Sequence, residues 1–326
     1  MSLPKILVIV GPTASGKTSA GVAIAKTVGG DVLACDSRTV YRGMDIGAAK
    51  PAGRPLLLED PRWRPEFLGE GRGPIVVEDV LHFGLDLASP RDEYNVSDFQ
   101  QYAWEVIKDM LRRHRVPVLV GGTGLWVDAV VRNLSLPEVP PDPALRATLD
   151  IMTLGDLFAD YKRLDPEGAE HVDRFNKRRV IRALEVTMKT SRPFWEQRKE
   201  GPKLYEPFWI GMDVEEEELR ERISLRVDQM LSQGLVNEVR ALFDTYGSSA
   251  SAMTGIGYRE LCQFFVGEIS LESAVECIKK HTWTLAKRQR TWWRGRGEVH
   301  WVKTAEEAVT LASRFVLPQA LLSRDS

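Results

Sequence analysis

Short apolar runs recur along the chain, and a turn or a glycine-rich segment follows most of them. The runs that we predict to be strands cover residues 6–10, 31–35, 116–120, 208–212 and 299–302. Runs of this length are typical of strands buried on both faces of a parallel sheet. Residues 98–114 instead place their apolar side chains on one helical face, and Ser97 with Gln100 predicts a capping box at its start. The pattern therefore predicts an α/β fold, in which helices flank a parallel sheet.

The first apolar run leads into Gly-Pro-Thr-Ala-Ser-Gly-Lys-Thr at residues 11–18. A strand, this G-x-x-x-x-G-K-[ST] spacing and a helix form a P-loop, whose glycines let several backbone N–H groups point at one phosphate cluster. Lys17 adds a positive charge, and Thr18 offers a hydroxyl to a phosphate-bound Mg²⁺. The sequence thus predicts a site for a diphosphate or triphosphate, without indicating what carries the phosphate.

Polar residues follow two further predicted strands. Asp36 and Ser37 come directly after residues 31–35, and a Gly-Gly-Thr-Gly turn with Thr123 follows residues 116–120. Ligands of open α/β sheets bind beyond the carboxyl ends of the strands, so we expect both turns beside the phosphate site. Two alternatives remain open for Asp36: a carboxylate that takes part in chemistry, or a plain turn or helix cap.

Composition limits the class of protein. The net charge is −2, so a strongly charged partner has to bind a local patch. The three cysteines form no C-x-x-C pair, which argues against structural zinc. No signal peptide or membrane-spanning run is recognisable, and we expect a cytoplasmic protein that is monomeric and has no membrane partner.

Two basic segments could provide such a patch. Residues 174–182 hold five Lys or Arg, and residues 281–296 combine five Lys or Arg with three Trp and no acid. Basic residues among large aromatic ones suit binding to a phosphate backbone with unstacked bases. The common alternative for the first segment is a solvated charged face. For some of the tryptophans in the second segment, the alternative is packing in the core. After the acidic residues 215–218, a predicted helix carries Arg222 and Arg226 one turn apart, either as surface ion pairs or as contacts to a diphosphate.

Longer motifs make a resemblance specific. Residues 36–51 read Asp-Ser-Arg-Thr-Val-Tyr-Arg-Gly-Met-Asp-Ile-Gly-Ala-Ala-Lys-Pro. This run resembles the signature of the tRNA dimethylallyltransferases, P-loop enzymes that place a five-carbon group on the exocyclic amine of the adenosine next to the anticodon. Thr39 stands where the family usually has glutamine, and Ala48 where it usually has threonine. Further matches lie at residues 121–126, 176–186, 254–259 and 281–296, so the resemblance covers nearly all of residues 5–302.

The resemblance implies a P-loop NTPase-like parallel sheet flanked by helices, with a small helical insertion domain. The catalytic core would comprise residues 1–135 and 174–318, including C-terminal helices that bind tRNA. Residues 136–173 would form the insertion, a lid that grips the anticodon stem-loop. Residues 51–77 lie outside the resemblance, and we expect an extra surface loop there, with a short hairpin within it as an alternative, and a frayed tail at residues 319–326.

The implied reaction is Mg²⁺-dependent transfer of a dimethylallyl group from dimethylallyl diphosphate to N6 of adenosine 37 in tRNA. It gives N6-isopentenyladenosine and diphosphate. The implied catalytic residues are Asp36, which accepts the amine proton, and Thr18 and Arg226, which stabilise the leaving diphosphate, Thr18 as the metal ligand.

The resemblance also assigns binding residues. Those for the diphosphate are Gly11, Pro12, Thr13, Ala14, Ser15, Gly16, Lys17 and Thr18. Those for tRNA are Asp36, Ser37, Arg38, Thr39, Thr123, Arg178, Arg179, Val180, Ile181, Arg182, Thr254, Gly255, Ile256, Gly257, Tyr258, Arg259, Thr282, Lys287, Arg288 and Gln289.

Two other functions share part of this pattern. A small-molecule kinase also has a P-loop, a strand and an Asp, and a related prenyltransferase acts on free adenine nucleotides. Neither needs the two basic segments at residues 174–182 and 281–296, which therefore favour an RNA substrate.

Overall fold

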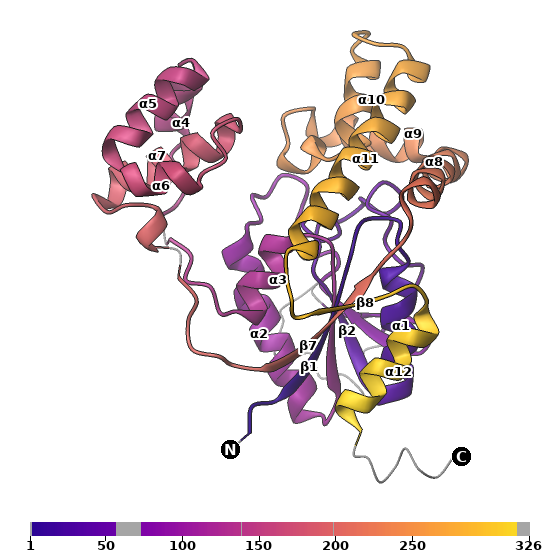
Figure 1. Cartoon of the computed structure of the whole chain (residues 1–326). Helices are drawn as coiled ribbons and strands as arrows, with labels where there is room; N and C mark the ends of the chain where they lie inside the picture. The colour runs from indigo at the N-terminus through magenta and orange to yellow at the C-terminus, as the bar shows by residue number, and fades with distance from the viewer. Residues whose placement is uncertain (1, 57–72, 138, 198, 318–326) are drawn as a thin grey trace. The chain divides into compact units, whose positions relative to one another are not determined.

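The computed structural model describes residues 2–56, 73–137, 139–197 and 199–317. The chain divides into two compact units, one made of Met1–Val130 with Leu204–Ser326 and the other of Val131–Lys203 (Figure 1). The first unit contains the sheet and the second is helical. No helix among the described residues is long and apolar enough to cross a membrane.

The first unit is built on a sheet with the strand order β3-β4-β5-β2-β6-β1-β7-β8. Its strands are β1 (Lys5–Val10), β2 (Gly30–Ala34), β3 (Arg54–Pro55), β4 (Ile75–Val77), β5 (Val80–Phe83), β6 (Val116–Val120), β7 (Glu206–Met212) and β8 (Val299–Val302). All five predicted strands are present, and the pairs from β5 to β8 are parallel. The carboxyl ends of β1, β2 and β6 therefore meet at one edge, as expected for a ligand site.

The two ends of the expected surface loop at residues 51–77 form a short hairpin, which is the alternative stated for this stretch. Strands β3 and β4 pair antiparallel there and extend the sheet beyond β5. The reason is apolar burial, because Val76 and Val77 on β4 are nearly fully buried. Residues 57–72 of this stretch, and the predicted tail at residues 319–326, lie outside the described residues.

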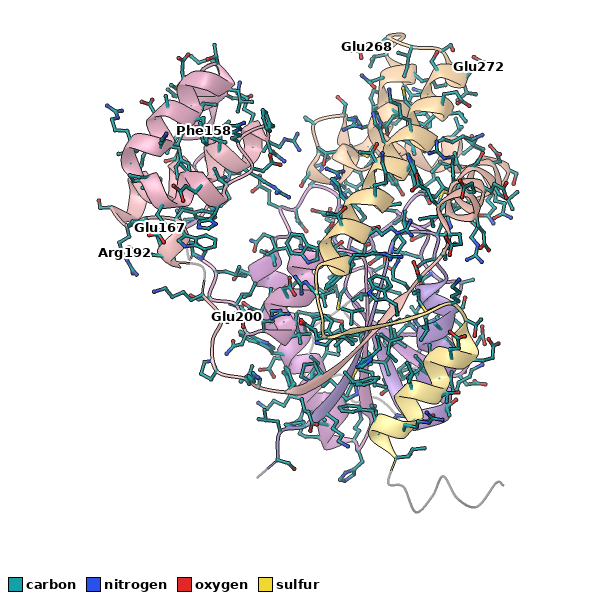
Figure 2. The ribbon with its side chains drawn as sticks, viewed as in Figure 1. Phe158, Glu167, Arg192, Glu200, Glu268 and Glu272 are labelled. Atoms are coloured by element: carbon teal, nitrogen blue, oxygen red, sulfur yellow. The ribbon has the colours of Figure 1, made fainter. Side chains whose placement is uncertain are left out.

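Helices cover both faces of the sheet (Figure 1). Those of the first unit are α1 (Lys17–Val28), α2 (Val96–Arg112), α3 (Gly124–Val131), α8 (Glu216–Ser232), α9 (Leu235–Tyr246), α10 (Tyr258–Phe265), α11 (Leu271–Arg294) and α12 (Ala305–Val316). Helices α1 and α12 pack on one face and α2 on the other, while α8 to α11 gather at the carboxyl ends of the strands. The turn with Glu268 and Glu272 lies at the far end of this helical group (Figure 2).

The start of α2 differs from the predicted capping box. Asn95 is the N-cap, its side chain accepts hydrogen bonds from the N–H groups of Ser97 and Asp98, and Asp98 accepts one from Asn95 N–H. The predicted partner Gln100 is buried and donates instead to the carbonyl of Ala129 at 2.6 Å. The same type of cap thus forms two residues earlier, because Gln100 is needed on the buried face.

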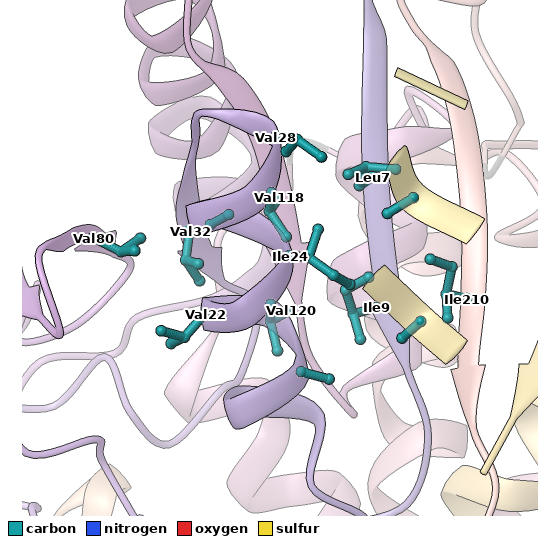
Figure 3. Packing of buried hydrophobic residues seen from close by; sticks show 14 of the residues in the cluster. Leu7, Ile9, Val22, Ile24, Val28, Val32, Val80, Val118, Val120 and Ile210 are labelled. Carbon is teal, nitrogen blue, oxygen red and sulfur yellow. The ribbon is translucent and has the colours of Figure 1, made fainter. Parts of the chain in front are cut away.

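The core between α1 and the sheet holds the P-loop edge in place. Leu7, Ile9, Ile24 and Val118 are fully buried and contact one another across this layer (Figure 3). Burying a side chain of this size stabilises a fold by roughly 1.5–3 kcal/mol. The strand ends that carry the site are therefore anchored in a well-packed core.

The second unit is a helical bundle of α4 (Pro143–Asp150), α5 (Leu154–Leu164), α6 (Pro166–His171) and α7 (Lys177–Thr190). Helix α7 contains the basic segment that we placed in the catalytic core, so the predicted boundary at residue 174 is wrong. Val180 and Leu184 on α7 pack with Leu157 and Tyr161 on α5 in one apolar cluster. This contact, which periodicity alone does not identify, makes α7 part of the insertion.

Candidate active site

The P-loop between β1 and α1 has the backbone that its glycines permit. Gly11 and Gly16 have φ angles of 141° and 86°, and Ala14 has 64°. A Cβ on Gly11 would lie 2.8 Å from the carbonyl oxygen of Met212, so only glycine fits there. The loop ends at the first turn of α1, where free N–H groups and the helix dipole favour an anion.

Lys17 lies among charged groups at this turn. Its Nζ donates to the carbonyl of Pro12 at 2.5 Å. Burial lowers the pKa of Lys17 to about 7, while Asp36 raises this pKa and Arg226 lowers it. The two neighbours come from β2 and α8, so the fold brings together three predicted site residues that are far apart in the sequence. A bound phosphate would favour the protonated lysine.

Asp36 makes the turn contact of one alternative that the sequence left open, and its place in the cavity is compatible with the catalytic alternative. Its Oδ1 accepts a hydrogen bond from Arg38 N–H at 2.9 Å, which is a turn-forming contact. Among the described residues no hydrogen bond engages Oδ2, and Asp36 lines a cavity next to the P-loop. One oxygen therefore fixes the turn and the other is left for a ligand.

The turns after β2 and β6 are joined, as predicted. Thr123 Oγ1 accepts from Ser37 N–H at 3.4 Å, and Thr39 Oγ1 donates to the carbonyl of Asp36 at 3.3 Å. Thr39 is buried and shapes this turn, and its contact with tRNA stays a prediction. Thr39 and Asp36 line the same cavity, of about 140 Å³, together with the P-loop and Arg226.

The two arginines of α8 differ in their surroundings. Arg222 forms an ion pair with Glu218 at 2.5 Å on the surface. Arg226, one turn further, lines the cavity beside the P-loop. Of the two alternatives for these arginines, the surface ion pair is the one found for Arg222. The position of Arg226 favours contact with a diphosphate.

Gln289, predicted to bind tRNA, instead supports the P-loop. It is 8% exposed, and its Oε1 accepts from Thr13 N–H at 2.7 Å. Gly122 makes room for it, because a Cβ there would lie 2.3 Å from Gln289 Nε2. Helix α11 therefore reaches the phosphate loop from the far end of the sequence.

The exposed side of α11 retains basic residues. Lys287 and Arg288 are exposed, and Thr282 is half-buried. The tryptophans divide as follows: Trp293 is fully buried and packs on Trp209, and Trp283 packs on a small apolar cluster beneath Arg220. Trp293 is therefore a core residue, as one alternative for the tryptophans predicted. The basic side chains of Lys287 and Arg288 remain exposed on the other side of the helix.

The turn at residues 254–259 joins the Asp36 segment through Arg38. The guanidinium of Arg38 donates to Thr254 Oγ1 at 3.2 Å and to the carbonyl of Ser251 at 3.4 Å. The expectation that the turn presents Tyr258 is wrong, since Tyr258 is 1% exposed and burial raises its pKa. Arg259 remains half-exposed and pairs with the buried Glu260.

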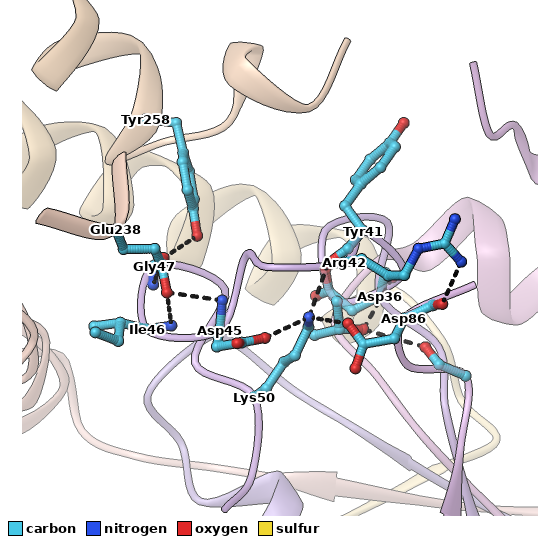
Figure 4. A network of polar contacts seen from close by, with 12 residues as sticks. Asp36, Tyr41, Arg42, Asp45, Ile46, Gly47, Lys50, Asp86, Glu238 and Tyr258 are labelled. Atoms are coloured by element: carbon cyan, nitrogen blue, oxygen red, sulfur yellow. Dashed lines mark hydrogen bonds and ion pairs between the residues drawn. The ribbon is translucent and has the colours of Figure 1, made fainter. Parts of the chain in front are cut away.

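Glu238 is a site residue that none of the sequence motifs contains. Its carboxylate accepts hydrogen bonds from the N–H groups of Asp45 (2.9 Å), Ile46 (2.7 Å) and Gly47 (3.0 Å), and from Tyr258 Oη at 2.7 Å (Figure 4). One acid on α9 thus ties the loop after Asp36 to α10. Its partners lie far away in the sequence, and no local motif marks it.

Replacing Glu238 with Gln should lower the free energy of unfolding by about 1–3 kcal/mol, because an amide nitrogen then faces backbone N–H donors. Urea denaturation measures this change. Tyr258→Phe is the matched control, since it removes one of the four hydrogen bonds and should cost about 1 kcal/mol. An E238Q midpoint equal to that of the unmodified protein would contradict this role.

In the second unit, the basic helix α7 is only partly available to RNA. Val180 and Ile181 are 0% and 6% exposed, so their predicted contact with tRNA is wrong as far as side chains are concerned. Arg182 donates to the buried Glu185 at 2.5 Å and to the carbonyl of Val139 at 2.8 Å. Arg178 and Arg179 are exposed, and Arg178 lines a surface cavity of about 360 Å³ with Arg146.

Glu185 explains why Arg182 turns inward. Burial by itself raises the pKa of this carboxyl. Hydrogen bonds from Arg146, the N–H of Asp142 and Arg182 lower the pKa by more than burial raises it, so the net shift is downward. A charged carboxylate inside the bundle needs these donors. Arg182 therefore stabilises the insertion, and its guanidinium is not a free RNA contact.

Comparison with known proteins identifies the family of this chain. The family model described as IPP transferase matches residues 73–296, and the model described as isopentenyl transferase matches residues 4–60. The tRNA dimethylallyltransferase of Geobacillus thermodenitrificans (strain NG80-2) is 39% identical over 303 residues, which cover 91% of this chain and 90% of the relative. That of Thermomicrobium roseum is 37% identical over 302 residues, covering 91% and 85%.

Solved structures show the same relationship. The full-length tRNA isopentenylpyrophosphate transferase from Bacillus halodurans is similar with a TM-score of 0.66 and 32% identity, covering 95% of both chains. The enzyme from Staphylococcus epidermidis gives 0.64 and 30%, covering 96% of this chain and 98% of the other. These matches confirm the P-loop NTPase-like α/β fold and do not favour a kinase or a free-nucleotide prenyltransferase. The chain therefore belongs to the family of tRNA dimethylallyltransferases, transferases that modify tRNA by isopentenylation.

Proposed function

We propose that the cavity beside the P-loop binds the diphosphate of dimethylallyl diphosphate and that Asp36 accepts the proton of the attacking amine. The observation that carries this proposal is that Lys17, Asp36 and Arg226 meet at one cavity. The acceptor is N6 of adenosine 37, next to the anticodon. The products are N6-isopentenyladenosine and diphosphate.

The leaving group gains negative charge as the carbon–oxygen bond breaks. The N–H groups of residues 11–18, Lys17 and Arg226 are positioned to stabilise that charge. Preformed donors aimed at developing charge are usually the largest catalytic contribution. Three positions are exceptions: Pro12 has no N–H, Thr13 N–H donates to Gln289, and Ser15 N–H donates to the carbonyl of Pro12, so these are not among the free donors.

The residues at the P-loop fit a magnesium ion that the diphosphate brings with it. The described residues contain no group of three or more His, Cys, Asp or Glu that would hold a metal ion alone. Mg²⁺ at a P-loop needs only one Ser or Thr hydroxyl, here Thr18, together with phosphate oxygens and water. When bound, Mg²⁺ would neutralise phosphate charge and orient the leaving group.

An exocyclic adenine amine is a weak nucleophile, so a base that removes its proton as the C–N bond forms is required. Asp36 Oδ1 is held by Arg38 N–H, which orients the carboxylate and leaves Oδ2 for that proton. The adenine has to leave the anticodon-loop stack to reach the cavity. The turn around Asp36, with Ser37 and Thr123, would contact the extruded nucleotide.

Both units offer basic side chains for the rest of the tRNA. Arg259, Lys287 and Arg288 are exposed in the first unit, and Arg178 and Arg179 in the second. We assign the anticodon stem-loop to these residues, the second unit being the lid. A tRNA substrate implies action in the cytoplasm, and we propose that the protein works as a monomer.

A direct test uses radiolabelled dimethylallyl diphosphate, Mg²⁺ and a synthetic anticodon stem-loop with adenosine at position 37. We expect label in the stem-loop and none in AMP or ATP assayed in parallel. The matched control is a stem-loop with guanosine at position 37, which should stay unlabelled. Label in a free nucleotide, or in the guanosine control, would contradict the proposed acceptor.

A further inference from the structure

A buried histidine lies in the wall of the diphosphate cavity. His82 is on β5, opposite Val32 of β2, and only 2% of its surface is exposed. It lines the same cavity as the P-loop, Asp36 and Arg226. Its Nδ1 is buried and has no hydrogen-bond partner among the residues that the structure describes.

An unpartnered buried nitrogen is unusual, because nearly all buried polar atoms in folded proteins are hydrogen-bonded. In the described part of the chain, the buried side-chain atoms without a partner are Ser15 Oγ, His82 Nδ1, Arg113 Nη2, Trp293 Nε1 and Ser313 Oγ. Of these five residues, only His82 lines the cavity. Its missing partner is therefore to be sought in the ligand of that cavity.

The surroundings of His82 narrow down that partner. Several residues of the wall near it are aliphatic, including Val32, Leu85 and Val120, and offer no hydrogen bond. Burial lowers the pKa of His82 to about 4, so the ring is neutral and carries one N–H. A neutral ring adds a hydrogen-bond donor to the cavity without repelling the charges of Lys17 or Arg226. The diphosphate that we propose at the P-loop offers many oxygen acceptors for such a donor.

We propose that His82 contacts the ligand of this cavity and that its imidazole N–H donates a hydrogen bond to an oxygen of the bound diphosphate. The inference deepens the proposed function, in which the same cavity holds the prenyl donor. His82 is then a third type of diphosphate contact, next to the backbone amides and the cationic side chains. No motif considered in the sequence predicts this contact, because it depends on the pairing of β5 with β2.

Two substitutions separate a ligand contact from a merely structural residue. His82→Phe keeps a ring of similar size and removes every N–H donor, whereas His82→Asn keeps an N–H donor near the position of Nδ1. Isothermal titration with inorganic diphosphate and Mg²⁺ should show binding weakened roughly 10- to 100-fold in H82F, since the lost bond involves a charged acceptor. H82N should stay within about fivefold. The melting temperature of H82F should not fall, since the variant loses an unpartnered buried atom.

The unmodified protein offers a second readout that does not depend on a variant folding. In ¹⁵N-histidine-labelled protein, diphosphate should shift the imidazole resonances of His82, while the other four histidines of the chain serve as internal references. Unshifted His82 signals at saturating diphosphate would overturn the inference, as would H82F that binds diphosphate normally.

The outcomes also separate this inference from the proposed function. If the stem-loop is not labelled but diphosphate binding depends on His82, the proposed reaction fails and the contact stands. If the stem-loop is labelled and H82F has an unchanged KM for dimethylallyl diphosphate, the contact fails and the reaction stands.

Discussion

Replacing Asp36 with Asn is expected to reduce the rate of transfer by roughly 10²- to 10⁴-fold, the usual contribution of a positioned general base. The amide keeps an oxygen that can accept from Arg38 N–H, so the turn after β2 should survive. What is lost is the carboxylate oxygen that we propose as the acceptor of the amine proton. Single-turnover rates at saturating stem-loop and dimethylallyl diphosphate measure this loss directly.

Binding should respond differently from chemistry. We expect the stem-loop to bind D36N within about threefold of the unmodified protein, because the substitution removes one charge and no fold-determining contact. Fluorescence anisotropy with a labelled stem-loop measures this affinity. Turnover at the original rate would refute the base assignment, and a matching loss of affinity and rate would make Asp36 a binding residue instead.

Replacing Arg226 with Ala is expected to lower kcat/KM for dimethylallyl diphosphate by roughly 10²- to 10³-fold, since it removes the half-buried cation that we propose as a donor to the leaving group. The chain supplies its own control one turn away. Arg222→Ala breaks a surface ion pair with Glu218 and should change kcat/KM by less than about twofold. Equal effects of the two substitutions would contradict the assignment.

The same variant should also change the pH dependence of diphosphate binding. Arg226 lowers the pKa of Lys17, which is about 7 in the free protein. Above that pH the free protein has lost the lysine proton and must take it up on binding, so affinity should fall as the pH rises. Without Arg226 the pKa of Lys17 rises, and the fall in affinity should begin at a higher pH.

Much of the fold could be predicted because its signals are local. The apolar runs of β1, β2, β6 and β7 mark buried strands, since a strand covered on both faces needs consecutive apolar side chains. The P-loop follows from its own spacing, since positive φ at Gly11 and Gly16 depends on the residue itself. Asp36 could be placed at the site because parallel strands bring their carboxyl ends to one edge.

Contacts between distant segments could not be predicted in this way. Glu238, Gln289 and His82 have partners or cavities supplied by elements far away in the sequence. Periodicity gives the face of a helix but not the element that covers it, which is why Tyr258 was wrongly expected to be presented to tRNA and α7 was assigned to the wrong unit.

The sequence by itself therefore determined the phosphate loop, the parallel strands and the family, because each rests on residues that act within a short stretch of chain. Only the tertiary structure decided that Arg226 and not Arg222 faces the cavity and that Gln289 holds the P-loop. The physical reason is that burial and hydrogen-bond partners of polar side chains are properties of packed surfaces. Those surfaces exist only once β2, α8 and α11 have come together.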